Sequence, residues 1–279
     1  MGELLSAYYT PNGSYLMQDQ EDGRRTPQID SFEQVRAEIE TAAPDAIVAV
    51  SPHWMPRRAF YVEDSIRHFN VNDYPLLPQP FGRRYFQYTV DGHPALARAI
   101  VAAARAAGLP SETKEYGIDH GAFTALRVMG ITRPVVPVAT SARPHAECRQ
   151  WGQAIRTAIE ATDLRVVALC PGNLSHRLDL RQDTEADEYD SDLSRFDEAA
   201  LELVTSGGYG TPTESLDTAL LKKASPETGL RTFSILHGLT GGAPGEVMMY
   251  KGFKYSVGDA TVRFPVAPSS TDADRLVDA

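Results

Sequence analysis

Two kinds of segment alternate along the chain when its hydrophobic and polar positions are compared. Short apolar runs rich in branched residues occupy 45–52 (DAIVAVSP), 134–140 (PVVPVAT) and 164–173 (LRVVALCPGN). Such runs are typical of strands buried on both faces of a parallel sheet. The segments 31–43, 93–109 and 146–162 instead repeat apolar residues every three or four positions, which predicts helices.

Further elements follow from the same patterns. Residues 3–9 (ELLSAYY) predict a first strand, and 194–207 and 228–242 predict two later helices. Ser31 is the expected N-cap of its helix, and Gly108 and Gly207 are expected helix ends. Residues 245–266 predict a final hairpin, with Gly258-Asp259 near its turn.

This alternation predicts an α/β fold: a single domain with a mainly parallel central sheet, flanking helices and a C-terminal β-hairpin. The 279 residues, 42% of them hydrophobic, suffice for one substantial core. We expect the domain to span residues 1–267, and residues 268–279 to form a mobile C-terminal tail.

The net charge of -10 argues against nucleic acid and an anionic membrane surface as partners. Much of the acidity lies in 181–198, which predicts a solvated loop entering a helix; a role at the mouth of a pocket is the alternative. Cys148 and Cys170 cannot build a disulfide framework, and no apolar run approaches the ~18 residues of a membrane span. A cytoplasmic protein with reduced thiols is the expectation.

Candidate chemistry gathers where predicted strands end, in 8–11 (YYTP), 50–54 (VSPHW) and 170–176 (CPGNLSH). Ligands bind at the carboxyl ends of strands in open parallel sheets, so we expect the site there. His53, His120 and His176 all lie at such element ends, and imidazole serves both metal binding and acid-base catalysis. Singly, each histidine is more often structural. The chain has no G-x-S-x-G elbow and no phosphate-binding loop in the required context.

The segments SPHW, DHGAF, GNLSHRL and FDEAALELV resemble the class III extradiol ring-cleaving dioxygenases. These are non-haem iron enzymes of the protocatechuate 4,5-dioxygenase catalytic-subunit type, which include aminophenol dioxygenase, and the resemblance runs from residue 4 to about 240. It implies Fe(II) held by two histidines and a glutamate, and a catechol-like substrate.

The resemblance transfers unevenly to this chain. It implies that His53 is an iron ligand with Trp54 beside it, that His176 is the acid-base residue, and that Asp119 and His120 face the substrate. The first ligand position falls on Tyr9, two residues before Pro11.

The glutamate position falls on Gly229. Glu227 or Glu246 replaces it only if the local alignment or backbone is shifted. The iron site therefore looks incomplete, with His53 as its one retained ligand. A phenol with an ordinary pKa near ~10 is a poor substitute for imidazole.

Three functions remain open. The first is an atypical, iron-poor or metal-free site that binds a small aromatic molecule. His176 is then the general acid/base, His120 and Asp119 are further catalytic residues, and Tyr9, His53 and Trp54 contact the ligand. The second is a non-catalytic subunit that pairs with an iron-containing paralogue. The third is an active Fe(II) dioxygenase with a substituted ligand set. The expected assembly is a homodimer or a hetero-oligomer with a homologous subunit.

Overall fold

The computed structural model describes residues 1–73, 85–180, 190–253 and 256–266. The expected tail and the first half of the acidic segment 181–198 lie outside these residues. The strands are β1 (Glu3–Thr10), β2 (Ala46–Ser51), β3 (Phe60–Val62), β4 (Arg67–Asp73), β5 (Tyr85–Asp91), β6 (Ser111–Thr113), β7 (Val135–Ala139), β8 (Arg165–Pro171), β9 (Glu246–Phe253) and β10 (Val257–Pro265).

The α-helices are α1 (Tyr15–Glu21), α2 (Pro27–Ala42), α3 (Pro94–Ala106), α4 (His120–Val128), α5 (His145–Glu160), α6 (Ser191–Ser206), α7 (Pro212–Ser215), α8 (Thr218–Ala224) and α9 (Arg231–Thr240). Two short 3-10 turns, η1 (Leu178–Leu180) and η2 (Glu227–Leu230), complete the described elements.

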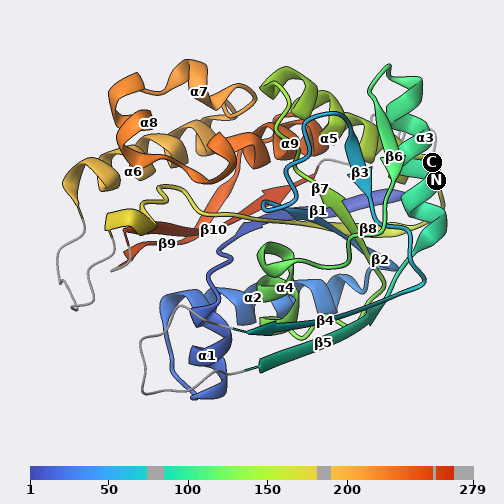
Figure 1. Cartoon of the computed structure of the whole chain (residues 1–279), viewed down its shortest axis with the longest axis horizontal. Coiled ribbons are helices and arrows are strands. Elements are labelled where there is room, and N and C mark those ends of the chain that lie inside the picture. Colours follow the sequence, from blue (N-terminus) through green and yellow to red (C-terminus); the bar gives the residue numbers. More distant parts are fainter. Residues whose placement is uncertain (74–84, 181–189, 254–255, 267–279) are drawn as a thin grey trace, which may run out of the picture.

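A central sheet organises the molecule, with strand order β6-β3-β7-β2-β8-β1-β10-β9 (Figure 1). The neighbours β7-β2, β2-β8 and β8-β1 are parallel, whereas β1-β10 and β10-β9 are antiparallel. This arrangement confirms the predicted α/β class, the mainly parallel sheet and the C-terminal hairpin.

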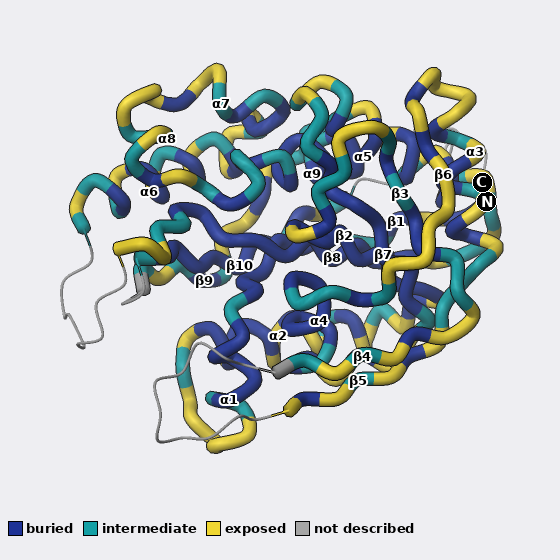
Figure 2. The backbone as a smooth tube through the Cα atoms, viewed as in Figure 1, coloured by how far each residue is buried: buried dark blue, intermediate teal, exposed yellow. Residues whose placement is uncertain are grey.

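Helices cover both faces of the sheet. In Figure 1, α3, α5, α6 and α9 lie on one face, while α1, α2, α4 and the β4-β5 ribbon lie on the other. Every residue of β2 and β7 is buried, as their unbroken apolar runs predict (Figure 2). Burying each such branched side chain contributes about 1.5–3 kcal/mol.

Some local expectations are wrong, for identifiable reasons. Helix α2 begins at Pro27, because the Thr26 hydroxyl accepts a hydrogen bond from Ile29 N at 3.2 Å. Ser31 therefore lies inside the helix, where its hydroxyl donates to the Gln28 carbonyl at 2.8 Å. Gly258 and Asp259 lie within β10 rather than at the hairpin turn.

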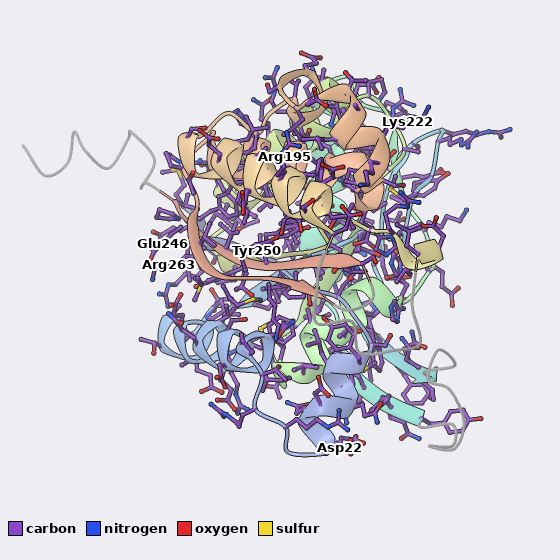
Figure 3. The ribbon with its side chains drawn as sticks, turned by 90° about the vertical axis from the view of Figure 1, so that its left-hand side faces the viewer. Asp22, Arg195, Lys222, Glu246, Tyr250 and Arg263 are labelled. Atoms are coloured by element: carbon purple, nitrogen blue, oxygen red, sulfur yellow. The ribbon has the colours of Figure 1, made fainter. Side chains whose placement is uncertain are left out.

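The outer hairpin is held partly by side chains. Arg263 and Glu246 form an ion pair across β10 and β9, and Figure 3 shows the two labelled residues side by side. Among the residues in the described ranges, no helix is long and apolar enough to cross a membrane.

Candidate functional site

The three strand ends singled out by their sequence lie next to one another. Strands β2, β8 and β1 are consecutive and parallel, so their carboxyl ends lie at the same edge of the sheet. The loops that follow carry His53, Asn173 with His176, and Asn12 with Ser14. Side chains from these three loops, from β4, from the start of α4 and from the turn η2 form the candidate site.

A direct contact between His53 and Glu227 lies at its centre. Nε2 of His53 is 2.8 Å from Oε1 of Glu227, whose side chain is only 7% exposed. Burial opposes ionisation of both groups, but each partner outweighs that effect in the other. The pKa of His53 is raised, by Glu227 and by Asp119. The pKa of Glu227 is lowered, mainly by His53. The geometry therefore favours an imidazolium-carboxylate ion pair.

Two asparagines complete the surroundings of the Glu227 carboxylate. Nδ2 of Asn12 lies 3.1 and 3.0 Å from its two oxygens, and the backbone N–H of Asn173 donates to Oε2 at 2.8 Å. Nδ2 of Asn173 in turn donates to Oδ1 of Asn12 at 2.6 Å. Both ends of the Asn12 amide are thus engaged, and both carboxylate oxygens accept protein hydrogen bonds.

A left-handed backbone turn brings Glu227 to this position. Thr228, Gly229 and Leu230 have φ values of 57°, 60° and 61°, so three successive residues lie in the left-handed region before α9 begins. Two of them are not glycine, and such a conformation costs roughly 1–2 kcal/mol per residue. Backbone strain of this kind concentrates at functional sites.

His120 stacks on His53, with ring centroids 5.1 Å apart and planes within 9°. Its Nδ1 lies 2.8 Å from the Ser14 hydroxyl and 3.2 Å from Nδ2 of Asn72. Burial and the neighbouring His53 lower the pKa of His120 to about 4. His120 is therefore neutral at physiological pH, and of the two stacked rings only His53 has a pKa shifted towards the charged form.

Asp119 positions His120 at the start of α4. Its carboxylate caps the helix by accepting from the backbone N–H of Gly121 at 3.1 Å. Both carboxylate oxygens also accept from the Ser51 hydroxyl, at 2.6 and 2.5 Å. Asp119 thereby links the end of β2 to the histidine.

His176 lies beside this cluster, and its electrostatic interaction with Glu227 contributes to lowering the pKa of that carboxyl group. Its backbone N–H donates to the Ala224 carbonyl at 2.9 Å, and it forms an isolated bridge with Val257. Trp54 is nearly buried, and its ring stacks on Tyr116 at 4.3 Å between centroids.

Three residues take places that differ from those the resemblance implied. The ring of Tyr9 is 1% exposed and packs in the core, edge-on against Phe233 at 5.0 Å. Gly229 lies inside the left-handed turn, and Glu227, two residues earlier, meets His53 instead. Glu246 pairs with Arg263 on the outer hairpin. The loop after β1 reaches the site through Asn12, three residues beyond Tyr9.

The donor set does not fit the iron site of a facial triad, which needs two histidines and one carboxylate. His53 and Glu227 supply two donors, but they contact each other directly. The third side chain is the Asn12 amide, whose nitrogen carries no free lone pair and whose oxygen accepts from Asn173. Within the described ranges, no group of three His, Cys, Asp or Glu side chains could hold a metal ion.

Sequence patterns alone did not single out Asn12, Ser14, Asn72 or Asn173. Asn173 stood in a strand-end segment already chosen for its histidine, and Asn12 and Ser14 follow another such segment directly. Asn72 comes from β4, a strand that was not predicted. The signal that could have revealed these site residues is the presence of amide side chains just after the carboxyl ends of parallel strands.

Comparison with known proteins identifies the family of the chain. Residues 7–265 match the family described as the catalytic LigB subunit of aromatic ring-opening dioxygenase. The chain therefore belongs to this family of extradiol-type, aromatic ring-cleaving dioxygenases, as the sequence motifs implied.

One relative and one solved structure illustrate the likeness. The chain is 26% identical over 198 residues to the 2-aminophenol 1,6-dioxygenase beta subunit of a Pseudomonas species, and the match covers 63% of each protein. The crystal structure of the uncharacterized protein JW3007 from Escherichia coli K12 has the same fold, with a TM-score of 0.67 and 18% identity. That match covers 93% of this chain and 99% of the other.

Proposed function

We propose that this chain binds a small hydroxylated aromatic molecule at a site without the iron of its family, with His176 as the general acid/base for a ring hydroxyl. The observation that carries the proposal is the saturated Glu227 carboxylate. It accepts hydrogen bonds from Asn12 and Asn173 and pairs with His53. Each carboxylate oxygen thus has two protein contacts, from Asn12 and His53 on Oε1 and from Asn12 and Asn173 on Oε2, which leaves no lone pair for a metal.

The remaining groups suit an aromatic ligand. The His53 side chain is 37% exposed, so a bound ring can reach it. Its raised pKa favours the imidazolium form, which attracts a phenolate or ring carboxylate and makes a favourable stacking partner for an aromatic face. His176, which has no carboxylate partner among the described residues, would take up the hydroxyl proton and return it.

A second function is favoured by one comparison. The curated relative is named as a beta subunit, so that protein is one part of a larger enzyme. We propose as the alternative that this chain is likewise a subunit, assembled with a homologous chain that carries the full iron-binding set. In that case the saturated carboxylate would maintain the fold of a site that no longer performs the reaction.

The experiment is a binding titration on chelator-treated protein with catechol, protocatechuate, 2-aminophenol and benzoate. Saturable binding of the hydroxylated rings is expected, unchanged within about twofold after anaerobic addition of Fe(II). His176→Ala should weaken binding of the hydroxylated rings about tenfold while benzoate is unaffected. His237→Ala, which alters a histidine near the far end of α9, is the matched control.

Two outcomes would overturn the proposal. One is the absence of saturable binding together with a mixed oligomer on co-expression with a homologous chain, which would establish the subunit alternative. The other is near-stoichiometric iron after reconstitution with ring cleavage of a catechol. That result would establish an active dioxygenase with a substituted ligand set.

A further inference from the structure

The turn between β1 and α1 holds two of the site contacts. Asn12 donates to Glu227, and Ser14 bonds to His120, from positions only two residues apart. A small displacement of this turn would therefore disturb both the carboxylate and the stacked histidines. What fixes the turn also fixes the site.

Tyr15 is the residue that closes this turn. Its ring folds back across Gly13, where even a Cβ atom would collide with it. Its hydroxyl donates to the carboxylate of Asp259, 244 positions later in the chain. Nε2 of Gln28 donates to the same carboxylate oxygen at 2.9 Å. Asp259 is fully buried, so it holds Tyr15 without competition from water.

We propose that Asp259 and Tyr15 are a positioning pair for the candidate site, fixing the Asn12–Ser14 turn and thereby its contacts with Glu227 and His120. Neither residue touches the proposed ligand. Both act through the backbone of the turn. Burial raises the pKa of Asp259 to about 6, and the nearby Asp197 and Glu227 charges act in the same direction. Tyr15 is a donor that the buried carboxyl retains in either protonation state.

The opposite side of β10 gives the same strand a second link to the site. Gly258 accepts from Leu174 N at 2.8 Å and donates to the Ser175 carbonyl at 2.9 Å, next to His176. A Cβ at Gly258 would collide with the Asp197 carboxylate, which itself binds Ser175 N at 2.8 Å. Tyr250, labelled in Figure 3, donates to Asp197 from β9 at 3.1 Å. The hairpin thus contacts two of the three strand-end loops that supply side chains to the site, those after β1 and β8.

This inference deepens the proposed function, because it rests on the site as located above. Its primary measurement needs no ligand. The side-chain amide signals of Asn12, assigned by their loss in Asn12→Asp, report the position of the turn by NMR. Tyr15→Phe keeps the ring and removes only the hydroxyl, whereas Asp259→Ala removes the acceptor and Asp259→Asn retains one.

Tyr15→Phe and Asp259→Ala should shift the Asn12 amide signals, and Asp259→Asn should leave them close to wild type. Catechol affinity should fall about fivefold in the first two, as expected for loss of one hydrogen bond. Tyr209→Phe is the control, because it removes a buried hydroxyl that bonds to Thr240 and Ala243 at the other end of α9. It should lower stability without moving the Asn12 signals.

The proposal fails if Tyr15→Phe lowers the melting temperature as Tyr209→Phe does and leaves the Asn12 signals unchanged. If Asp259→Ala does not fold, the Asn12 amide signals of Tyr15→Phe alone test the proposal. A protein that binds none of the aromatic probes would contradict the proposed function. The amide signals would still show whether the pair positions the turn.

Discussion

Nε2 of His53 lies 2.8 Å from Oε1 of Glu227, although 174 positions separate the two residues in the chain. This contact joins the end of β2 to the turn before α9. In a facial triad, two histidines and a carboxylate would bind the metal instead of each other. The third side chain at this contact is the amide of Asn12, which donates to the same carboxylate.

The first prediction concerns Asn12→His. An imidazole at this position would give the two-histidine, one-carboxylate set that Fe(II) and Co(II) bind. We expect the variant to bind Co(II) at least tenfold more tightly than wild type, measured by its visible absorption in a titration. Asn12→His combined with Glu227→Gln is the control and should lose the gain. Equal affinities in wild type and Asn12→His would show that Asn12 does not stand in a ligand position.

The second prediction concerns pH and the ion pair. The raised pKa of His53 gives stability that is present below pH 6.5 and lost as pH rises through its folded value. The lowered pKa of Glu227 gives stability that is present above pH 4.5 and lost as pH falls through its folded value. Both contributions are therefore complete between about pH 4.5 and 6.5.

Glu227→Gln should accordingly destabilise the protein most within that window. Urea unfolding of both proteins from pH 4 to 9 measures this difference. We expect the free energy of unfolding to fall by at most about 1–3 kcal/mol, because hydrogen-bond donors remain around the neutral amide. A loss that does not vary with pH would contradict the assignment of an ion pair.

The third prediction concerns Asp259, whose folded pKa is raised from 3.8 to about 6. A raised carboxyl pKa means that the folded state takes up a proton more readily than the unfolded state. The contribution of Asp259 to the stability of the fold is most favourable below pH 3.8 and is lost as pH rises through about 6. The free energy of unfolding of Asp259→Asn, relative to that of wild type, should therefore rise by roughly 2–3 kcal/mol as the pH increases from 4 to 8. Parallel stability curves for the two proteins would exclude this titration.

The fourth prediction concerns Gly229 in the left-handed turn. Gly229→Ala should destabilise the protein by roughly 1–2 kcal/mol, because φ is +60° there and the new Cβ meets the Arg231 side chain. Gly23→Ala is the matched control, with φ at +68° and open space around it. Only Gly229→Ala should also shift the Asn12 amide signals, since it alone displaces Glu227. If both variants shift them equally, the turn does not set the position of Glu227.

The strands of the sheet were predictable because a buried parallel strand needs an unbroken apolar run, as in Ala46–Ser51. The three strand-end loops followed from the same runs. The ribbon β4-β5 was missed, because β4 inverts the usual pattern: the apolar Phe69 and Val71 are exposed, whereas the polar His68 is buried.

The identity of the carboxylate could not be read from the chain. A motif placed by counting along a helix puts Gly229 at that position. Three left-handed residues separate Glu227 from the helix, and two of them, Thr228 and Leu230, are not residues that common turn patterns place in this conformation. The strand of Tyr9 continues to Thr10, and the Tyr9 side chain is buried in the core.

The antiparallel place of β10 has a consequence for how the molecule is made. Its beginning, not its end, lies at the edge where the parallel strands finish, next to β1. Strand β1 is therefore synthesised long before β10, and the loop after β1 can be held in place only once β10 is present. Contacts across such a separation form late in folding, after the loop-closure entropy has been overcome. A chain that stops short of Asp259 would carry every histidine discussed above and still lack an ordered site.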